Sequence, residues 1–281
     1  MKIIVANWKM NHAFEEADLW LDSFMEDFLN QDNDFSDKKI ILCPPLFIMD
    51  YIDGQLMEDG FKNLEDAVAK ENKNIAEFSD EELTKIVLSQ RLIILGGQDC
   101  HHEKSGSFTG DISAAMLKKV GCQYVILGHS ERRNNHFETS EIVNKKIRAA
   151  LAEDISPIIC VGESEEIRAQ GKHLEFIYQQ IMKSVPQDVK FKKLIIAYEP
   201  VWSIGTGVTP TAAQIAEVAK FIKKVFNEKL NNVASEFFIL YGGSVSAENS
   251  KEILAVSNID GLLVGKASLD AKEFLKICLS K

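Results

Sequence analysis

The sequence predicts a closed barrel of eight parallel β-strands, each followed by a helical segment. Eight short apolar runs recur along the chain, at residues 2–7, 39–43, 92–95, 124–127, 157–161, 194–198, 237–241 and 261–264. Amphipathic helical patterns separate these runs, which is typical of parallel β/α units. The length of 281 residues suits one domain of this kind, and no linker or low-complexity tract divides it. We therefore expect residues 1–281 to form a single α/β barrel domain.

The first half of the barrel is predicted from local signals. After the strand at residues 2–7, apolar side chains recur at helical spacing: Ala17, Trp20, Leu21, Phe24, Met25 and Phe28. The second strand, residues 39–43, is expected to end at Pro44 and Pro45, because proline lacks the backbone N–H that a strand ladder needs. A second helix should follow, to about Leu56.

A highly charged segment of about residues 57–91 precedes the third strand. Within it, Ser79 and Glu82 have the spacing of a capping box, and Leu83, Ile86 and Val87 follow with helical periodicity. This pattern predicts helices instead of disorder. We expect an insertion between the second helix and the third strand, on the surface and away from the carboxyl ends of the strands.

The later strands alternate with clear helical patterns. The strand at residues 92–95 is followed by a long polar loop, which runs to Asp111. The clearest helix carries apolar residues at Ile215, Val218, Ile222, Val225 and Phe226. We expect Thr209 to cap this helix and Pro210 to take its first position, where a missing N–H costs nothing.

Residues 197–207 contain a carboxylate followed by an apolar loop. Glu199 ends a buried strand, and Pro200 stops that strand. Val201, Trp202 and Ile204 then lie between the proline and two glycines, Gly205 and Gly207. Such a loop is either a lid that moves as one unit over a site or a buried connection between two elements.

Composition and charge exclude several classes of partner. The formal net charge of −10 argues against nucleic acid and anionic membrane surfaces. No apolar run reaches membrane-spanning length, and the first residues form a strand, not a signal peptide. Five cysteines without paired spacing, Cys43, Cys100, Cys122, Cys160 and Cys278, predict reduced and mostly buried thiols. We therefore expect a cytoplasmic protein.

Polar residues follow several strands at their carboxyl ends, which is where a parallel β/α barrel places its active site. Asn7 and Lys9 follow the first strand, His129 follows the fourth, and Glu199 ends the sixth. Taken singly, each has an ordinary interpretation: a solvated lysine, a structural histidine, or a glutamate in an ion pair. Their occurrence on one rim favours an active site.

Glycine turns on the same rim predict a phosphate site. Gly242, Gly243 and Ser244 follow the seventh strand, and Gly265 and Lys266 follow the eighth, each ahead of an expected helix start. Backbone N–H groups at glycine turns and helix starts bind phosphate without a basic side chain, and barrels often carry such a site after strands seven and eight. Gly205, in the loop after the sixth strand, adds a third candidate donor.

Metal and nucleotide sites are not predicted. His101 and His102 are adjacent, so they lack the i, i+4 spacing with which two histidines on a helix bind zinc. The segment from Gly261 to Lys266 fails the spacing of a nucleotide phosphate loop, and no Ser or Thr follows the lysine directly.

The chain resembles the triosephosphate isomerase family, and its motifs carry the resemblance over nearly the whole length except about residues 57–91. These motifs are Asn7-Trp8-Lys9-Met10-Asn11, Gly128-His129-Ser130-Glu131-Arg132-Arg133, Ala197-Tyr198-Glu199-Pro200-Val201-Trp202, Ile204-Gly205-Thr206-Gly207 and Tyr241-Gly242-Gly243-Ser244-Val245. The resemblance implies interconversion of dihydroxyacetone phosphate and glyceraldehyde 3-phosphate, without a metal or an organic cofactor.

The resemblance also implies a role for each matched residue. Glu199 would be the base that moves a proton between C1 and C2, and His129 would polarise the carbonyl and move protons between the oxygens. Lys9 would supply positive potential and Asn7 would hold an oxygen. Phosphate-binding positions are matched by Gly205, Ser244, Gly265 and Lys266. His129 precedes an expected helix start, whose dipole would disfavour its cationic form.

The family pattern implies a homodimer as well. The loop from Gln98 to Asp111 would reach the neighbouring subunit, with Gln98 and Thr109 bracing the region around Lys9. The chain departs from the family at several positions: Asp99 replaces the usual Asn, Asp111 the usual Glu, Ser203 the usual Ala, and Lys266 the usual Gly. The alternative function is a catalytically silent barrel that serves as a binding or scaffold protein.

Overall fold

The barrel consists of eight parallel strands that pair in chain order, with β8 closing onto β1. The computed structural model describes residues 1–29, 37–62, 78–79, 83, 91–204 and 209–280. The strands are β1 Lys2–Asn7, β2 Lys38–Cys43, β3 Ile93–Gly97, β4 Tyr124–Leu127, β5 Ser156–Val161, β6 Phe191–Tyr198, β7 Ala234–Tyr241 and β8 Gly261–Val264. The predicted (β/α)8 barrel is confirmed.

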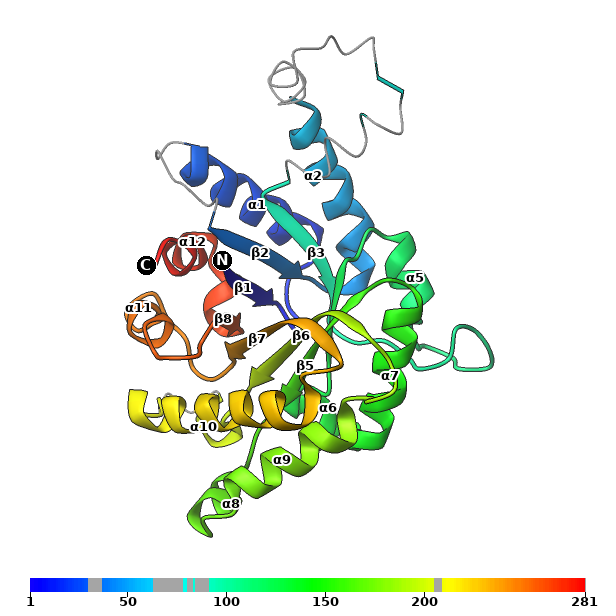
Figure 1. Ribbon diagram of the computed structural model, residues 1–281. Helices are drawn as coiled ribbons and strands as arrows, with labels where there is room; N and C mark the ends of the chain where they lie inside the picture. Colours follow the sequence, from blue (N-terminus) through cyan, green and yellow to red (C-terminus); the bar gives the residue numbers. More distant parts are fainter. Residues whose placement is uncertain (30–36, 63–77, 80–82, 84–90, 205–208, 281) are drawn as a thin grey trace.

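Helices surround the strands on the outside (Figure 1). The longer ones are α1 Phe14–Leu29, α2 Met49–Lys62, α7 Ser140–Ala152, α9 His173–Ser184, α10 Ala212–Val225 and α12 Ala271–Leu279. Shorter ones are α5 Ala114–Lys119, α6 Ser130–Asn135, α8 Glu165–Ala169 and α11 Ser250–Leu254, and 3-10 turns occur at Leu46–Ile48, Val201–Ser203 and Lys266–Leu269. A π-helical turn, Phe226–Leu230, extends α10.

The core has two layers because successive side chains of a strand point to opposite faces of the sheet. In β1, Ile3 and Val5 point into the barrel, whereas Ile4 and Ala6 pack against the surrounding helices. Both faces are apolar and buried, so the strands appear in the sequence as continuous apolar runs.

Several element boundaries differ from the prediction, and β3 runs to Gly97 instead of residue 95. β6 and β7 begin three residues before the predicted starts at 194 and 237, because Phe191 pairs with Ala234 and Lys193 with Glu236 ahead of the apolar runs. The prediction of Thr209 as the cap of α10 was wrong. The Thr211 side chain accepts a hydrogen bond from the N–H of Gln214, and Oε1 of Gln214 accepts one from the N–H of Thr211. This reciprocal capping box satisfies two donors at the helix start.

The predicted insertion begins as a continuation of the second helix. α2 runs to Lys62 and so includes residues 57–62 of the segment; its far end extends beyond the strands (Figure 1). Of the remainder, residues 63–77, 80–82 and 84–90 lie outside the described part of the chain, so the predicted helix after Ser79 falls there as well.

All five cysteines are buried and none is in a disulfide, as the sequence analysis predicts. Across the described ranges, no helix has both the length and the apolar character needed to cross a bilayer.

Candidate active site

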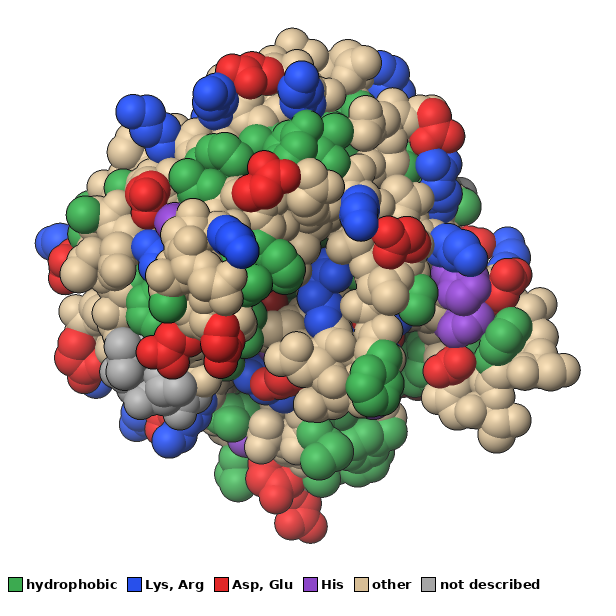
Figure 2. Space-filling view, turned by 90° about the horizontal axis from the view of Figure 1, so that it is seen from below, with side chains coloured by type: hydrophobic (Ala, Val, Ile, Leu, Met, Phe, Trp, Pro, Cys, Tyr) green, Lys and Arg blue, Asp and Glu red, His purple; other side chains and the backbone are tan. Residues whose placement is uncertain are grey.

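The predicted site residues meet at the carboxyl ends of the strands, where they line one cleft of about 820 Å³. The residues brought together there are Asn7, Lys9, His129, Glu199, Ser244, Gly265 and Lys266. The face shown in Figure 2 is hollowed near its centre, and Lys and Arg side chains lie within the hollow beside acidic ones. Gly205 lies outside the described residues.

Glu199 is held at the floor of the cleft by the ends of two neighbouring strands. Its backbone N–H donates to the carbonyl of Val161, the last residue of β5, at 2.8 Å. Its carboxylate is almost fully buried, and Oε2 accepts a hydrogen bond of 3.0 Å from the backbone N–H of Ser130. Oε1 lies 2.9 Å from Nε2 of His129. The carboxylate is therefore fixed between a helix start and an imidazole.

His129 caps α6, as the sequence predicts. Its Nδ1 accepts a hydrogen bond of 3.2 Å from the N–H of Glu131, so the ring proton lies on Nε2, which faces Glu199. Burial lowers the pKa of His129, but the nearby Glu199 carboxylate raises it, and the pKa lies above its ordinary value. The expectation based on the helix dipole alone missed this carboxylate.

Removing the negative charge of Glu199 should lower the pKa of His129. In the variant Glu199→Gln, burial and the helix start remain, and both disfavour the imidazolium. We expect the pKa to fall, measured by titrating the ¹⁵N-labelled ring with NMR. A pKa that stays in place or rises would contradict this assignment.

The contact between His129 and Glu199 should also make stability depend on pH. Because the fold raises the pKa of His129 in the wild type, the stabilisation that the folded protein gains from this contact is complete below pH ~6.5. It is lost as the pH rises through the folded pKa.

Lys9 is held in place by its backbone and by an acidic neighbour. It has a positive φ of 55°, and its N–H donates to Asn7 Oδ1 at 3.1 Å. Its Nζ lies 2.6 Å from Glu131 Oε1. Gln98 donates from Nε2 to the carbonyl of Lys9 at 2.8 Å and to that of Cys43 at 2.9 Å. The bracing role implied for Gln98 is thus met within the same chain, because β3 ends beside β2.

Ser244 and Gly265 line the cleft directly after the ends of β7 and β8. Ser244 Oγ donates to the carbonyl of Ser203 at 2.6 Å, which ties the turn after β7 to the turn after β6. A 3-10 turn begins at Lys266 directly after Gly265, as expected. The prediction of a helix start right after Ser244 was wrong, because α11 begins only at Ser250. The Asn249 side chain accepts a hydrogen bond from the N–H of Ser246 and donates one to the carbonyl of Ser244, which holds a wider turn.

The side chain of Lys266 is exposed at the edge of the cleft. Replacing it by glycine keeps the backbone N–H at this position, so we expect KM to change by less than ~3-fold and kcat to stay unchanged. A direct ammonium–phosphate contact is worth ~1.5–3 kcal/mol, and losing it would raise KM by ~10-fold or more. Steady-state kinetics of Lys266→Gly at two salt concentrations decides this: a tenfold rise that shrinks at high salt would overturn the expectation.

Three residues of the site were not singled out from the sequence. Ser130 contributes its backbone N–H to Glu199, and Glu131 contacts both Lys9 and His129. Gly162 packs so closely on the Glu199 backbone that a Cβ built on it would lie 1.6 Å from the Glu199 carbonyl oxygen. The expected helix start after His129 was a signal for the first two. A single glycine after a strand is no such signal, so Gly162 was not predicted.

The arrangement suits proton transfer to and from a small anionic molecule. A buried carboxylate and an imidazole that presents an N–H lie in contact, with an ammonium group in the same cleft. Within the described ranges, no group of three or more His, Cys, Asp or Glu side chains is arranged to hold a metal ion.

Comparisons with known proteins all lead to one family. The family model described as "Triosephosphate isomerase" matches residues 62–281. The triosephosphate isomerase of Dictyoglomus turgidum is 39% identical over 282 residues, covering 99% of each chain, and that of Aquifex aeolicus is 38% identical over 281 residues with the same coverage. The crystal structure of triosephosphate isomerase from Bartonella henselae superposes with a TM-score of 0.76 at 32% identity, covering 99% of this chain and 97% of the other.

Proposed function

The chain belongs to the triosephosphate isomerase family and interconverts dihydroxyacetone phosphate and D-glyceraldehyde 3-phosphate, and we propose that Glu199 and His129 carry its proton transfers. The single observation that carries this proposal is their contact: Glu199 Oε1 lies 2.9 Å from His129 Nε2 inside the cleft. A general base and an N–H donor must reach the carbon and the oxygen of one small substrate together.

Glu199 removes a proton from C1 of dihydroxyacetone phosphate. The electrons of the broken C–H bond form a C1–C2 double bond, and negative charge develops on O2, where His129 donates its Nε2 proton. His129 then recovers a proton from O1, the carbonyl forms at C1, and Glu199 returns its proton to C2. The ring and the carboxylate end as they began, so only protons move and no metal or organic cofactor is required.

Substrate entry should also favour the neutral form of the His129 ring. In the arrangement described above, the Glu199 carboxylate raises the pKa of the ring. When the carboxylate turns towards the substrate carbon, that charge leaves the ring. The N–H of Glu131 at Nδ1 and the burial of the side chain then favour the neutral imidazole, which donates from Nε2.

The remaining site residues bind the substrate. Lys9 stabilises the developing charge on oxygen and the phosphate, and Asn7 holds a substrate oxygen. The phosphate is bound by backbone N–H groups of Ser244, Gly265 and Lys266, with Gly205 of the apolar loop adding one more. The exposed side chain of Lys266 takes no part in this binding.

The protein works as a homodimer in the cytoplasm. The loop from Gln98 to Asp111 projects from the barrel between β3 and α5 (Figure 1). Phe108 in this loop is 42% exposed, and Met10, next to Lys9, is 96% exposed, which favours burial against a second copy. Five reduced thiols suit a cytoplasmic location. Residues 1–281 form one domain, with an insertion of about residues 57–91.

A coupled assay tests this function. Dihydroxyacetone phosphate is supplied, and a dehydrogenase reports the glyceraldehyde 3-phosphate formed. We expect turnover in the presence of a chelator, because the isomerase itself needs no metal and no cofactor. The alternative of a catalytically silent barrel predicts none, although it has no observation in its favour. Absence of turnover by the folded protein would reject the proposed roles.

A further inference from the structure

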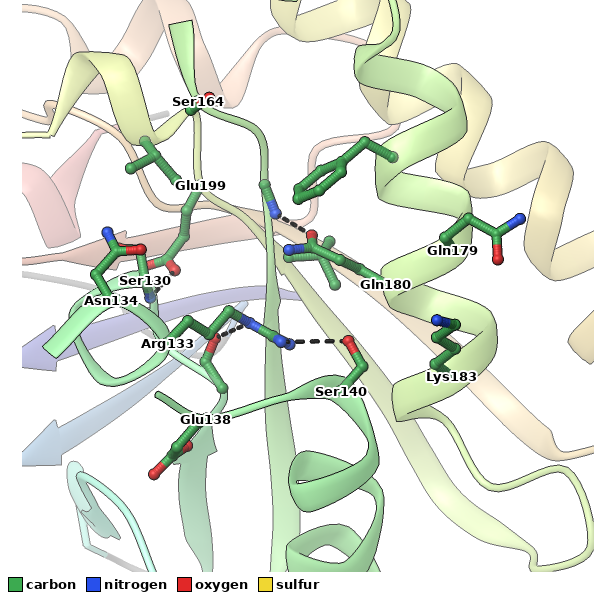
Figure 3. A pocket seen from close by; sticks show the side chains of 15 residues that line it. Ser130, Arg133, Asn134, Glu138, Ser140, Ser164, Gln179, Gln180, Lys183 and Glu199 are labelled. Atoms are coloured by element: carbon green, nitrogen blue, oxygen red, sulfur yellow. Dashed lines mark hydrogen bonds between the residues drawn. The ribbon is translucent and has the colours of Figure 1, made fainter. Parts of the chain in front are cut away.

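A second cavity lies behind Glu199, on the side away from the cleft. Its volume is about 370 Å³, within the range of small-molecule sites. The cavity lies between α6 and α9, and Glu199 lines both it and the cleft. In Figure 3, Glu199, Ser130 and Asn134 stand on one side of the cavity, and Gln179, Gln180 and Lys183 on the other. The carboxylate thus forms a wall shared by two cavities.

The charges around this cavity cancel. Two cationic and two anionic side chains line it, namely Arg133, Lys183, Glu138 and Glu199. The Arg133 guanidinium already donates to the carbonyls of Gly128 and Cys160 at 2.8 and 3.2 Å. Glu138 pairs with Lys146 and Arg132, and its carboxylate points away from the other labelled side chains (Figure 3). An ionic ligand would therefore gain no net attraction here, whereas an uncharged one meets no penalty.

The groups that remain for a ligand match a primary amide. Glu199 Oε2 accepts one hydrogen bond, from the Ser130 N–H, and keeps a second lone pair for another N–H donor. Gln180 accepts the N–H of Gly162 through Oε1 at 2.8 Å, which directs its own NH2 towards the middle of the cavity (Figure 3). That NH2 suits a carbonyl oxygen, whereas the exposed ammonium of Lys183 lies 3.7 Å from Glu141 Oε1. Phe176 and Val201 add an apolar wall.

We propose that this cavity binds a small uncharged molecule with a primary amide and an apolar group, and that its occupation inhibits the isomerase by holding Glu199 against Ser130. The inhibition rests on the proposed role of Glu199 as the base; the binding does not. The ligand's NH2 donates to the carboxylate, which already accepts the Ser130 N–H at 3.0 Å. An additional donor stabilises the ionised carboxylate in this position and makes it a weaker base.

Occupation should affect turnover and leave substrate binding unchanged. Lys9, Ser244 and Gly265 line the cleft and not the second cavity, so a ligand behind Glu199 does not meet the substrate's phosphate. The expected signature is a lower kcat at constant KM. A molecule that bound in the cleft would instead raise KM and leave kcat unchanged.

Benzamide is a suitable probe because its ring fits beside Phe176 and its amide reaches Gln180 and Glu199. For a ligand of this size we expect half-maximal inhibition at about 1–10 mM. At ~50 mM, kcat should fall at least ~5-fold while KM changes less than ~2-fold. Saturation-transfer NMR should show binding of benzamide to the wild type, and ~50 mM inorganic phosphate, which occupies the cleft, should not displace it.

Gln179→Trp fills the mouth of the cavity, because Gln179 is exposed on α9 and lines the opening. This variant should keep its basal activity and lose both the benzamide NMR signal and the inhibition. Gln187→Trp is the matched control, since Gln187 is exposed but does not line the cavity, and it should bind and respond like the wild type.

Three outcomes would overturn the proposal: no benzamide binding to the wild type, displacement of benzamide by phosphate, or binding with unchanged kcat. A failure of the proposed role of Glu199 as the base would be seen in a different experiment. The variant Glu199→Gln would then keep its activity, while binding of benzamide to the wild type, measured by NMR, would be unaffected.

Discussion

Replacing Glu199 by glutamine is expected to lower kcat by at least ~10³-fold, within the range for a positioned general base or above it. Glutamine keeps the size of the side chain, and its Oε1 is still able to accept the N–H of Ser130, so the fold and the cleft should persist. What it lacks is the ability to take the C1 proton. KM should therefore change far less than kcat, which steady-state kinetics with dihydroxyacetone phosphate measures directly.

Glu273→Gln is the matched control for this variant. Glu273 lines the same cleft from the first turn of α12, and none of the proposed proton transfers involves it. Its kcat should stay within about threefold of the wild type. If Glu199→Gln retained activity within ~10-fold, or if Glu273→Gln lost as much as Glu199→Gln, Glu199 would not be the base.

Replacing Gly162 by alanine is expected to destabilise the protein by at least ~3 kcal/mol and to lower kcat by ~10²-fold. The new Cβ would lie 1.6 Å from the carbonyl oxygen of Glu199 and 2.6 Å from its carbonyl carbon. Both are backbone atoms, so a change of rotamer relieves nothing and the ends of β5 and β6 must move apart. A displacement of ~1 Å at a catalytic group costs about two orders of magnitude in rate.

Gly54→Ala provides the comparison for this loss of stability. Gly54 lies within α2, and a Cβ at that position meets no atom within 4 Å. Alanine favours a helix over glycine by ~0.5–1 kcal/mol, so this variant should melt at or slightly above the wild-type temperature. Thermal unfolding followed by circular dichroism compares the two. A Gly162→Ala protein as stable and as active as the wild type would show that the two strand ends are not packed as described.

Much of the fold follows from the sequence because both faces of each strand are buried. The run 194–198, for example, is apolar throughout, and its residues alternate between the barrel interior and the helix layer. The start of β6 was missed because Lys192 and Lys193 precede the apolar core, and only pairing with β7 makes them part of the strand. The sequence favours Thr209 as the cap because Pro210 follows it, whereas the capping box forms two residues later, at Thr211.

The candidate site was predictable where a residue's own position in the chain determines its place. Asn7 ends β1, and His129 and Glu199 follow β4 and β6. Parallel strands of a closed barrel end on one rim, so their meeting needed no further information. Contacts between distant segments were not predictable. The sequence does not show that Ser130 donates to Glu199, 69 residues away, or that Glu199 raises the pKa of His129. Nor does it show the cavity behind Glu199, whose walls come from four separate segments.

The most direct test of the role of Glu199 is the incorporation of deuterium into dihydroxyacetone phosphate in D2O, followed by proton NMR. A base that removes the C1 proton exchanges it with solvent before returning it, so the wild-type protein should yield substrate and product carrying one deuterium at carbon. Glu199→Gln should yield essentially none over the same period, while Glu273→Gln should match the wild type. Deuterium incorporation by Glu199→Gln at the wild-type rate would contradict the assignment of Glu199 as the base.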